Sequence, residues 1–429
     1  MAFKIGLLGY GTVGTGTAEI ILDPGGRNGL LSEIEISKVG VRSPGKQRSP
    51  QLPAGVITTD LESIVTDSEI DIVVELLGGL EPSRSLILQA IEHGKHIVTA
   101  NKAVIARHGE EIFTAANKAG VYVLLEAAVG GGIPVIKPLK QSLGVNRLQT
   151  VIGIINGTTN YILTQMTQEG ADFGEVLAEA QKLGYAEADP TADVDGYDAA
   201  DKIAILAAIA FNGRIKRDEI SCEGIRKITA TDISYADDLG FVIKLLAIAK
   251  ANDSDNSLQV RVHPTLVSKE HPLANVNGVY NAILVEGDPL GQVMLYGPGA
   301  GKGATASAVV SDIVNIIGFL QTDRAKSLDP MLSCPHEHFK QLTPISKIRS
   351  RFYARFLCED VSGVIGHLGT SFGKHDVSLE SVVQIGFRDN LAEIVVVTHD
   401  VHEGNFRNAL EEIKSLDSIN SIPSILRVL

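Results

Sequence analysis

Residues 3–14 read FKIGLLGYGTVG, and this stretch decides the fold of the first third of the chain. The apolar run 3–8 predicts a buried strand, and Gly9, Gly11 and Gly14 complete the pattern G-x-G-x-x-G ahead of a helix. In that context Gly9 makes the tight turn, Gly11 lets a pyrophosphate approach the backbone, and Gly14 lets helix and strand pack closely. The pyrophosphate would also gain the N–H groups at the helix N-terminus. We predict a dinucleotide site, against the alternative of a structural turn, at Gly9, Tyr10, Gly11, Thr12, Val13 and Gly14.

Four further apolar runs alternate with helical stretches through the first 130 residues. We predict strands at 34–41, 71–77, 96–99 and 121–125. We predict helices at 14–22, 60–66, 83–93 and 110–119. Continuous apolar strands separated by helices are typical of a parallel sheet covered on both faces. The fold class is therefore α/β, with a doubly wound, Rossmann-type parallel sheet at the N-terminus.

After residue 130, the pattern of apolar residues predicts a second, α+β domain and a smaller C-terminal domain. In the second domain the periodicity predicts helices at 172–183, 197–212 and 238–251 and strands at 148–155, 257–264 and 279–285. Residues 351–429 alternate strand, helix, strand, strand, helix, strand. We expect a dinucleotide domain at 1–130 completed by a helix at about 304–320, a substrate and dimerisation domain at 131–325, a linker at 326–350 and a last domain at 351–429.

Composition narrows the class of protein. The 38 Lys and Arg against 51 Asp and Glu give a net charge of −13, which argues against a nucleic-acid partner because phosphate binding needs a basic face. The three cysteines show no C-x-x-C spacing, so a disulfide framework and a thiolate zinc site are not expected. We see no signal peptide and no apolar run long enough to span a bilayer. These features predict a cytoplasmic, multidomain protein.

The end of the second predicted strand bears on the choice of dinucleotide. A site selective for NAD places a carboxylate there to bind the ribose 2′-OH. This chain instead has Arg42, with Lys46 and Arg48 following. Because a guanidinium can bind a 2′-phosphate, we predict NADP(H), with NAD(H) as the alternative cofactor and a solvated basic loop as the alternative role for Arg42.

A dense acidic block ends at a single lysine. Six carboxylates lie between Glu187 and Asp201, and Lys202 follows. If a helix begins near Tyr197, Asp198 and Lys202 lie at i and i+4 on one face. A carboxylate so placed stabilises and orients an ammonium group that transfers a proton to a substrate oxygen. The alternative is a solvated acidic loop with an ion pair at the helix end.

Two shorter segments also follow predicted strands. Lys102, in Thr99-Ala100-Asn101-Lys102, lies at the carboxyl edge where open sheets bind ligands, and it can reach either substrate or cofactor; a surface lysine at a loop is the alternative. Glu126 precedes the glycine-rich turn 129–134. One carboxylate with exposed carbonyl oxygens suits a hard cation, and a domain hinge is the alternative.

Taken together, six motifs resemble the homoserine dehydrogenase family over about residues 3–330. They are GLLGYGTVG, TANK, EAAVGGGIP, INGTTNYIL, GYAEADPTADVDGYDAADK and YGPGAGKGATASAVVSD. The resemblance implies interconversion of L-homoserine and L-aspartate 4-semialdehyde with a nicotinamide dinucleotide, in threonine and methionine biosynthesis. It implies that Lys202 is the catalytic proton donor and Lys102 a second catalytic lysine near the nicotinamide.

The same resemblance implies the remaining ligand contacts. Substrate contacts would fall on Glu187, Asp198, Asp193, Tyr185 and Thr158. Further cofactor contacts would fall on Lys102, Gly184, Glu187 and Gly303. A monovalent cation, Na⁺ or K⁺, would bind Glu126 and the backbone carbonyls of Val129, Gly131 and Ile133.

The C-terminal domain resembles an ACT domain, a βαββαβ module that binds amino acids at paired interfaces. The family commonly has Pro-Gly at the first turn, where this chain has Ser362-Gly363. The resemblance implies feedback control by an amino acid such as threonine, and a homodimer or homotetramer. A dimerisation module without a ligand is the alternative.

The same residues bear on two rival functions. Another two-domain oxidoreductase would lack the acidic block that ends in Lys202. A non-catalytic dinucleotide- and amino-acid-sensing regulator would not need Lys102, Glu187, Asp198 and Lys202, and all four are present.

Overall fold

The computed structural model describes residues 2–252, 255, 257–322, 328–334, 336 and 338–429. It divides into two compact units, each assembled from separate segments of the chain. The first unit comprises Met1–Ile155, Asp198–Glu219 and Tyr280–Lys340, and the second comprises Asn156–Tyr197, Ile220–Val279 and Gln341–Leu429. The predicted linker 326–350 lies partly outside the described residues, at 326, 327, 335 and 337, and its described part contains a short 3-10 helix, Ile345–Lys347.

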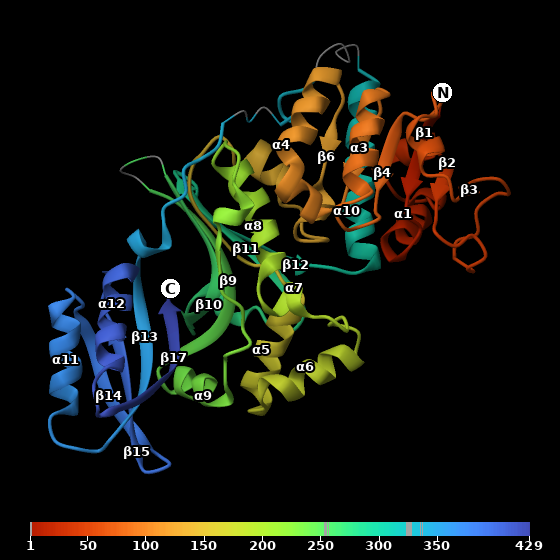
Figure 1. Ribbon diagram of the computed structural model, residues 1–429. Coiled ribbons are helices and arrows are strands. Elements are labelled where there is room, and N and C mark those ends of the chain that lie inside the picture. The colour runs from red at the N-terminus through yellow and green to blue at the C-terminus, as the bar shows by residue number, and fades with distance from the viewer. Residues whose placement is uncertain (1, 253–254, 256, 323–327, 335, 337) are drawn as a thin grey trace. The chain divides into compact units, whose positions relative to one another are not determined.

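A six-stranded parallel sheet organises the first unit, in the order β3-β2-β1-β4-β5-β6 (Figure 1). Its strands are β1 Phe3–Leu8, β2 Ile34–Gly40, β3 Ile57–Thr58, β4 Ile72–Glu75, β5 His96–Thr99 and β6 Val123–Leu124. All five neighbouring pairs are parallel. This strand order is that of a dinucleotide-binding doubly wound sheet, so the predicted Rossmann-type fold is confirmed.

Helices cover both faces of this sheet. The helices of this sheet are α1 Thr12–Leu22, α2 Glu62–Val65, α3 Ser83–Glu92, α4 Lys102–Ala119 and α10 Lys302–Leu320. Side chains of α1 and α10 form one core with Ile5 and Leu7, whereas Ile64 of α2 packs over the opposite face at Gly6. α10 has the length and apolarity of a membrane span, but its buried face belongs to this core, as expected of a core helix.

The first unit also contains an antiparallel ribbon and one long helix. The ribbon has the order β12-β11-β7 and comprises β7 Arg147–Ile154, β11 Tyr280–Asp288 and β12 Gly291–Pro298. Helix α8, Tyr197–Ala210, begins at the residue where the sequence predicted a helix start. Because the helix begins there, Asp198 and Lys202 lie one turn apart on the same face of α8.

In the part of the chain that the structure describes, the second unit contains a mixed sheet and four α-helices before its C-terminal module. The helices are α5 Gly157–Glu169, α6 Phe173–Lys182, α7 Thr191–Val194 and α9 Ala230–Asp238. The sheet strands in this part are β8 Ser221–Cys222, β9 Phe241–Ala251 and β10 Leu258–Ser268. Long antiparallel pairing joins β9 to β10, and β8 pairs with β10 in parallel.

The C-terminal module has the predicted strand–helix–strand–strand–helix–strand order, with one additional short strand. Its elements are β13 Arg349–Cys358, α11 Val364–Lys374, β14 Leu379–Arg388, β15 Leu391–Thr398, β16 Val401–His402, α12 Glu403–Lys414 and β17 Ile419–Val428. The sheet order is β17-β13-β15-β14, and both helices pack on it through a core that contains Phe352, Phe372 and Phe406. β17 also pairs in parallel with β10, so the module continues the sheet of its unit.

One predicted element is wrong. Residues 238–251 were predicted to be helical, but Phe241–Ala251 is strand β9, paired residue by residue with Leu258–Ser268. A continuous apolar run buried on both sides has no period of two that would distinguish it from a buried helix. Gly240, with φ +83°, forms the turn that separates helix α9 from this strand.

Candidate active site

Two lysines share one buried carboxylate in the first unit. The Nζ of Lys202 donates to Oδ2 of Asp198 at 2.6 Å and to the carbonyl oxygen of Ile155 at 2.8 Å. The Nζ of Lys102 lies 3.0 Å from the other oxygen, Oδ1 of Asp198. The side chains of Asp198 and Lys202 are 7% and 12% exposed, whereas that of Lys102 is 40% exposed. The predicted i, i+4 pair is therefore present, and a lysine from a distant segment joins it.

Helix capping fixes the position of Lys102. Lys102 is the first residue of α4, and Oδ1 of Asn101 accepts the backbone N–H of Val104 as the N-cap. The sequence predicts this helix only from residue 110, whereas α4 begins eight residues earlier, at Lys102. The Asn101 side chain also donates to the carbonyl of Gly79, which ties the start of α4 to the loop after β4.

A second ion-pair cluster links α4 to α8. Asp201, which is buried, accepts from Nη1 of Arg107 at 2.9 Å and from Nε of Arg217 at 2.6 Å. Arg107 lies on α4 and Asp201 directly precedes Lys202 on α8. The two arginines were not among the predicted site residues. The sequence pointed to them only indirectly, through Asp201, a carboxylate of the acidic block that had no predicted partner or role.

The glycine-rich turn has the geometry expected of a pyrophosphate site. Gly9 has φ +111°, a conformation that favours glycine. A Cβ on Gly14 would lie 2.2 Å from the carbonyl oxygen of Gly9, so no larger residue fits there. A Cβ on Gly11 would meet nothing within 4 Å, which leaves this backbone open to a ligand. Arg48 also closes over the turn, donating through Nε to the carbonyl of Tyr10. Arg42 is exposed beyond the end of β2.

The remaining substrate candidates lie in the second unit, on α5 and in the segment between α6 and α8, which contains the short helix α7. Thr158, on α5, donates through Oγ1 to the carbonyl of Tyr185 at 2.7 Å. Oδ1 of Asp193, on α7, accepts from Nδ2 of Asn156 at 2.6 Å. The backbone carbonyl of Glu187 accepts from Gln181, and its side chain is exposed. Gly184, with φ +78°, turns the chain from α6 into this loop.

Glu126 is buried, with its carboxylate surrounded by backbone N–H groups. Its Oε1 accepts from Val135 and Ile136, and its Oε2 accepts from Lys137, at 2.6–3.0 Å. A carboxylate has about four acceptor positions, so these three bonds leave one for a cation. A Cβ on Gly131 would lie 2.4 Å from the carbonyl of Gly299, so the glycine turn at 129–134 packs directly against the turn that leads to Gly303.

A buried aspartate next to Glu126 gives stability a distinct pH dependence. Asp312 accepts the Glu126 N–H at 2.8 Å and lies 3.1 Å from Nζ of Lys137. Burial raises the pKa of Asp312 to about 6, with Lys137 opposing the shift and Glu126 adding to it. A carboxyl group whose pKa is raised on folding contributes stability that is present below about pH 4 and lost as the pH rises to about 6.

We therefore expect the free energy of unfolding of the wild type, minus that of Asp312→Asn, to fall as pH rises. A shift from 3.8 to about 6 corresponds to a fall of about 3 kcal/mol between pH 4 and pH 7. Urea unfolding at four pH values in that range measures it, with the exposed surface variant Asp237→Asn as the control. A difference that does not change with pH would contradict the assignment.

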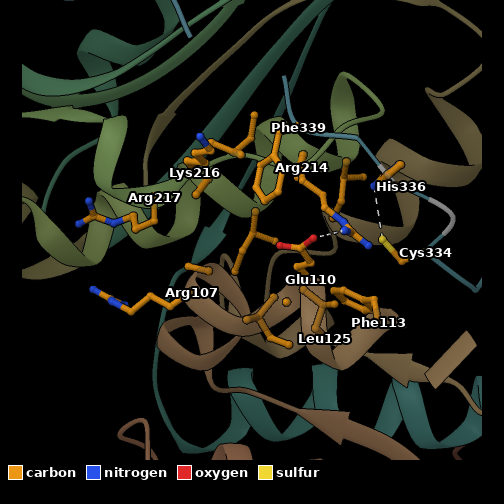
Figure 2. A pocket seen from close by; sticks show the side chains of 18 of the residues that line it. Arg107, Glu110, Phe113, Leu125, Arg214, Lys216, Arg217, Cys334, His336 and Phe339 are labelled. Atoms are coloured by element: carbon orange, nitrogen blue, oxygen red, sulfur yellow. Dashed lines mark hydrogen bonds and ion pairs between the residues drawn. The ribbon is translucent and has the colours of Figure 1, made fainter. Parts of the chain in front are cut away.

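An apolar cavity of about 360 Å³ lies further along α4 and α8, within the first unit (Figure 2). Phe113 and Phe339 face it, and Arg214 closes one side by donating to Glu110 at 2.7 Å. Cys334 lies 3.3 Å from Nδ1 of His336, and burial lowers the pKa of this histidine to about 4 while raising that of the thiol. A raised thiol pKa lowers the fraction of the reactive thiolate, and none of the predicted site residues lines this cavity.

A glycine turn on a parallel sheet, in one unit with two lysines on a shared carboxylate, defines an NAD(P)-dependent oxidoreductase. Residues 9–126 match the family model of the homoserine dehydrogenase NAD binding domain, and residues 134–314 match the model of homoserine dehydrogenase. The chain belongs to the homoserine dehydrogenase family. Residues 352–418 match the ACT domain, so the C-terminal module is of that type.

Similar proteins cover most or all of the chain. A homoserine dehydrogenase of Synechocystis sp. is 68% identical over 100% of both chains. The crystal structure of a homoserine dehydrogenase from Thiobacillus denitrificans is 42% identical, with a TM-score of 0.91 over 100% of this chain and 98% of that chain. A hyperthermophilic archaeal homoserine dehydrogenase in complex with NADPH is 26% identical, with a TM-score of 0.63 over 76% of this chain and 100% of that chain.

Proposed function

We propose that the chain interconverts L-homoserine and L-aspartate 4-semialdehyde, in threonine and methionine biosynthesis in the cytoplasm, with Lys202 as the proton donor. The observation that carries this assignment of roles is the Asp198 carboxylate held between Lys202 and Lys102. The nicotinamide supplies or accepts the hydride when it is bound. The protein then has to orient the substrate and to manage the charge on its oxygen.

Lys202 is placed to manage that charge. Hydride addition to an aldehyde develops negative charge on the carbonyl oxygen, which an adjacent ammonium stabilises and then protonates. Two N–H groups of Lys202 are directed at Asp198 and at the Ile155 carbonyl, so the third is available for the substrate oxygen. In the reverse direction the same amine accepts the hydroxyl proton. Lys102, which is more exposed, is the second catalytic lysine, and its ammonium keeps a positive charge beside Asp198 while Lys202 is without its proton.

We propose that the acidic loop holds the amino-acid part of the substrate. Homoserine carries an ammonium group, and Glu187 and Asp193 supply carboxylates on this loop, with Asp198 at the start of α8. Tyr185 and Thr158, already joined by a hydrogen bond, are the neutral contacts. Gly184, Glu187, Lys102 and Gly303 complete the cofactor contacts beyond the glycine turn.

We propose NADP(H) as the preferred cofactor, with Arg42 binding the 2′-phosphate. Reduction of NADP⁺ and of NAD⁺ by L-homoserine, followed at the nicotinamide absorbance, tests both the reaction and the preference. Arg42→Ala should raise KM for NADP⁺ by about tenfold, the loss expected for one charge-assisted contact, and leave KM for NAD⁺ within twofold. Equal effects on the two cofactors would remove Arg42 from the phosphate site, and absent turnover of homoserine would overturn the reaction.

A monovalent cation is the remaining proposed ligand. Glu126 retains one acceptor position, and the backbone carbonyls of Val129, Gly131 and Ile133 are hard oxygen ligands on the adjoining turn. The cation, Na⁺ or K⁺, would hold this turn in place at the start of α10. Comparing activity in sodium, potassium and tetramethylammonium chloride at one ionic strength tests it.

We propose that the ACT module senses threonine and joins subunits in a homodimer or homotetramer. Its first turn keeps Gly363 with φ +96°, ahead of α11, so replacing the usual proline by Ser362 leaves the turn intact. We expect threonine at millimolar concentration to reduce turnover of the full chain at least threefold, with alanine at the same concentration as control. An unchanged rate would leave the module as a dimerisation device.

A further inference from the structure

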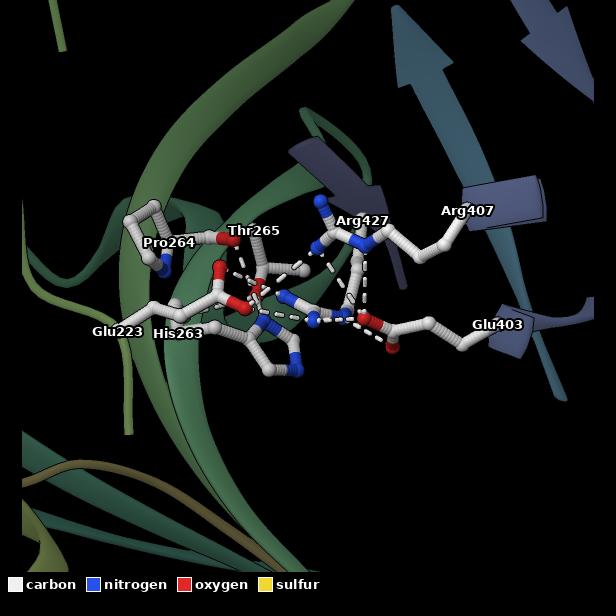
Figure 3. Close-up of polar contacts among 7 residues, drawn as sticks. All are labelled: Glu223, His263, Pro264, Thr265, Glu403, Arg407 and Arg427. Atoms are coloured by element: carbon white, nitrogen blue, oxygen red, sulfur yellow. Dashed lines mark hydrogen bonds and ion pairs between the residues drawn. The ribbon is translucent and has the colours of Figure 1, made fainter. Parts of the chain in front are cut away.

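An ion-pair cluster in the second unit joins the ACT module to a short segment before α9 (Figure 3). Arg427, on β17, donates to both carboxylate oxygens of Glu223, at 2.8 and 3.0 Å. Arg427 also donates to Glu403, the first residue of α12, and Arg407 on the same helix lies 3.6 Å from Glu223. The Arg427 side chain is 4% exposed, so its two carboxylate partners are required to balance a buried charge.

Although its side chain is 43% exposed, Glu223 is held by two hydrogen bonds from Arg427. Burial opposes ionisation of this carboxyl, but the bonds from Arg427 outweigh it, and the pKa of Glu223 lies below its ordinary value. Under Arg427, His263 is fully buried, and burial and the nearby arginines hold its pKa well below the usual range. The imidazole is therefore neutral and does not compete for the carboxylates. The Glu223 carboxylate therefore pairs with Arg427 and Arg407 of the ACT module.

We call residues 221–226 the strap, because they run from this cluster to the loop that carries Asp193. At one end, the Glu223 N–H donates to the carbonyl of Val262 on β10. At the other end, the Ile225 N–H donates to the carbonyl of Val194 at 2.8 Å, and Arg226 donates to Oδ1 of Asp195 at 2.5 Å.

The backbone of the strap at Gly224 lies in direct contact with the backbone of Val194 and Asp195. A Cβ on Gly224 would lie 2.2 Å from the carbonyl oxygen of Val194 and 2.4 Å from Cα of Asp195. Backbone therefore lies directly on backbone, and Asp193 precedes the contacted residue by one position. A displacement of the strap cannot be absorbed by a flexible side chain, because none lies between the two segments.

We propose that Glu223 is a positioning residue for substrate binding: through the strap it fixes the loop of Asp193, and the ACT arginines hold Glu223. This inference rests on the proposed role of Asp193 in binding homoserine. It also gives the route by which an amino acid bound to the ACT module changes the affinity for substrate, since Arg427 and Arg407 belong to β17 and α12.

Steady-state kinetics of the full chain test the positioning role. Glu223→Gln should raise KM for homoserine about tenfold while KM for NADP⁺ stays within twofold. Glu223→Asp keeps the charge and should restore KM for homoserine to within threefold of the wild type. The control is Glu380→Gln, which replaces a carboxylate of similar exposure, 41% against 43%, and breaks its ion pair with Arg351 inside the ACT module, away from the strap.

A second variant covers the outcome that Glu223→Gln fails to fold. Arg226 is 43% exposed, so Arg226→Gln removes the bond to Asp195 without emptying a buried site. It should raise KM for homoserine in the same selective way. An unchanged KM for homoserine in both folded variants, or an equal rise in KM for both substrates, would overturn the positioning role.

Threonine titration separates this inference from the sensor proposal. If the wild type responds to threonine, Glu223→Gln should need at least tenfold more threonine for half-inhibition, and an unaltered response would overturn the route through the strap. If the wild type does not respond, the sensor proposal fails, and the KM measurements still decide the positioning role.

Discussion

Lys202→Met is expected to lower kcat by about a thousandfold, in the range that loss of a general acid costs, while NADPH binding stays within twofold. Methionine keeps the length and apolar stem of lysine but cannot donate to Asp198, to the Ile155 carbonyl or to a substrate oxygen. Initial rates with homoserine and NADP⁺, and titration of NADPH fluorescence, measure the two quantities. Turnover within tenfold of the wild type would remove the proton-transfer role.

A lysine elsewhere in the same unit provides the control for this variant. Lys4, on β1, donates to Glu69 at 2.7 Å and is part of no proposed site. Lys4→Met breaks a lysine–carboxylate pair that is more exposed, and it should keep kcat within twofold. A large loss in both variants would show that any lost lysine pair disturbs the unit, and the loss at Lys202 would then carry no information on catalysis.

Gly14→Ala is expected to have the largest effect on the cofactor site. The new Cβ would lie 2.2 Å from the Gly9 carbonyl oxygen, so the turn has to move away from the start of α1. We expect the free energy of unfolding to fall by about 3 kcal/mol, the upper end of overpacking costs, and KM for NADP⁺ to rise at least tenfold. Urea unfolding and steady-state kinetics measure these changes.

Gly11→Ala separates cofactor contact from folding at the same turn. Its Cβ has open space in the protein, and alanine at this N-cap costs about 0.5 kcal/mol against glycine. KM for NADP⁺ should still rise, because the methyl group occupies the approach to the backbone that a pyrophosphate uses. An unchanged KM in Gly11→Ala would place the pyrophosphate elsewhere.

The parts of the site that depend on local spacing could be predicted from the sequence. The glycine turn follows from three glycines between a strand and a helix, and the Asp198–Lys202 pair follows from a spacing of four on one helix. The position of Lys102 beside Asp198 could not be derived from spacing, because it depends on how α4 packs in the unit. The same holds for Arg107 and Arg217, which meet Asp201 only in the folded chain.

The one misassigned element has a related cause. Phe241–Ala251 is rich in alanine, leucine and lysine, residues that favour helices, and its lysine Lys244 is buried. The strand forms because every residue from 241 to 251 pairs with β10. Burial lowers the pKa of Lys244 to about 8, and its ammonium donates to the carbonyl of Val276 and to Asn277. The pairing with β10 thus overrides the local helix preference of these residues. A short window of sequence does not contain the information on that pairing.

Because β17 pairs in parallel with β10, the C-terminal module cannot be removed without breaking the sheet of its unit. Thr265 and Leu266 of β10 lie opposite Arg427 and Val428, and the Leu429 N–H donates to the carbonyl of Leu266. Cutting the chain before β17 would expose the unpaired backbone edge of the neighbouring strands to other molecules. It would also leave Glu223 and Glu403 without their buried partner Arg427. To test the proposed feedback through the ACT module, single substitutions are therefore preferable to truncation, which would also expose this strand edge to aggregation.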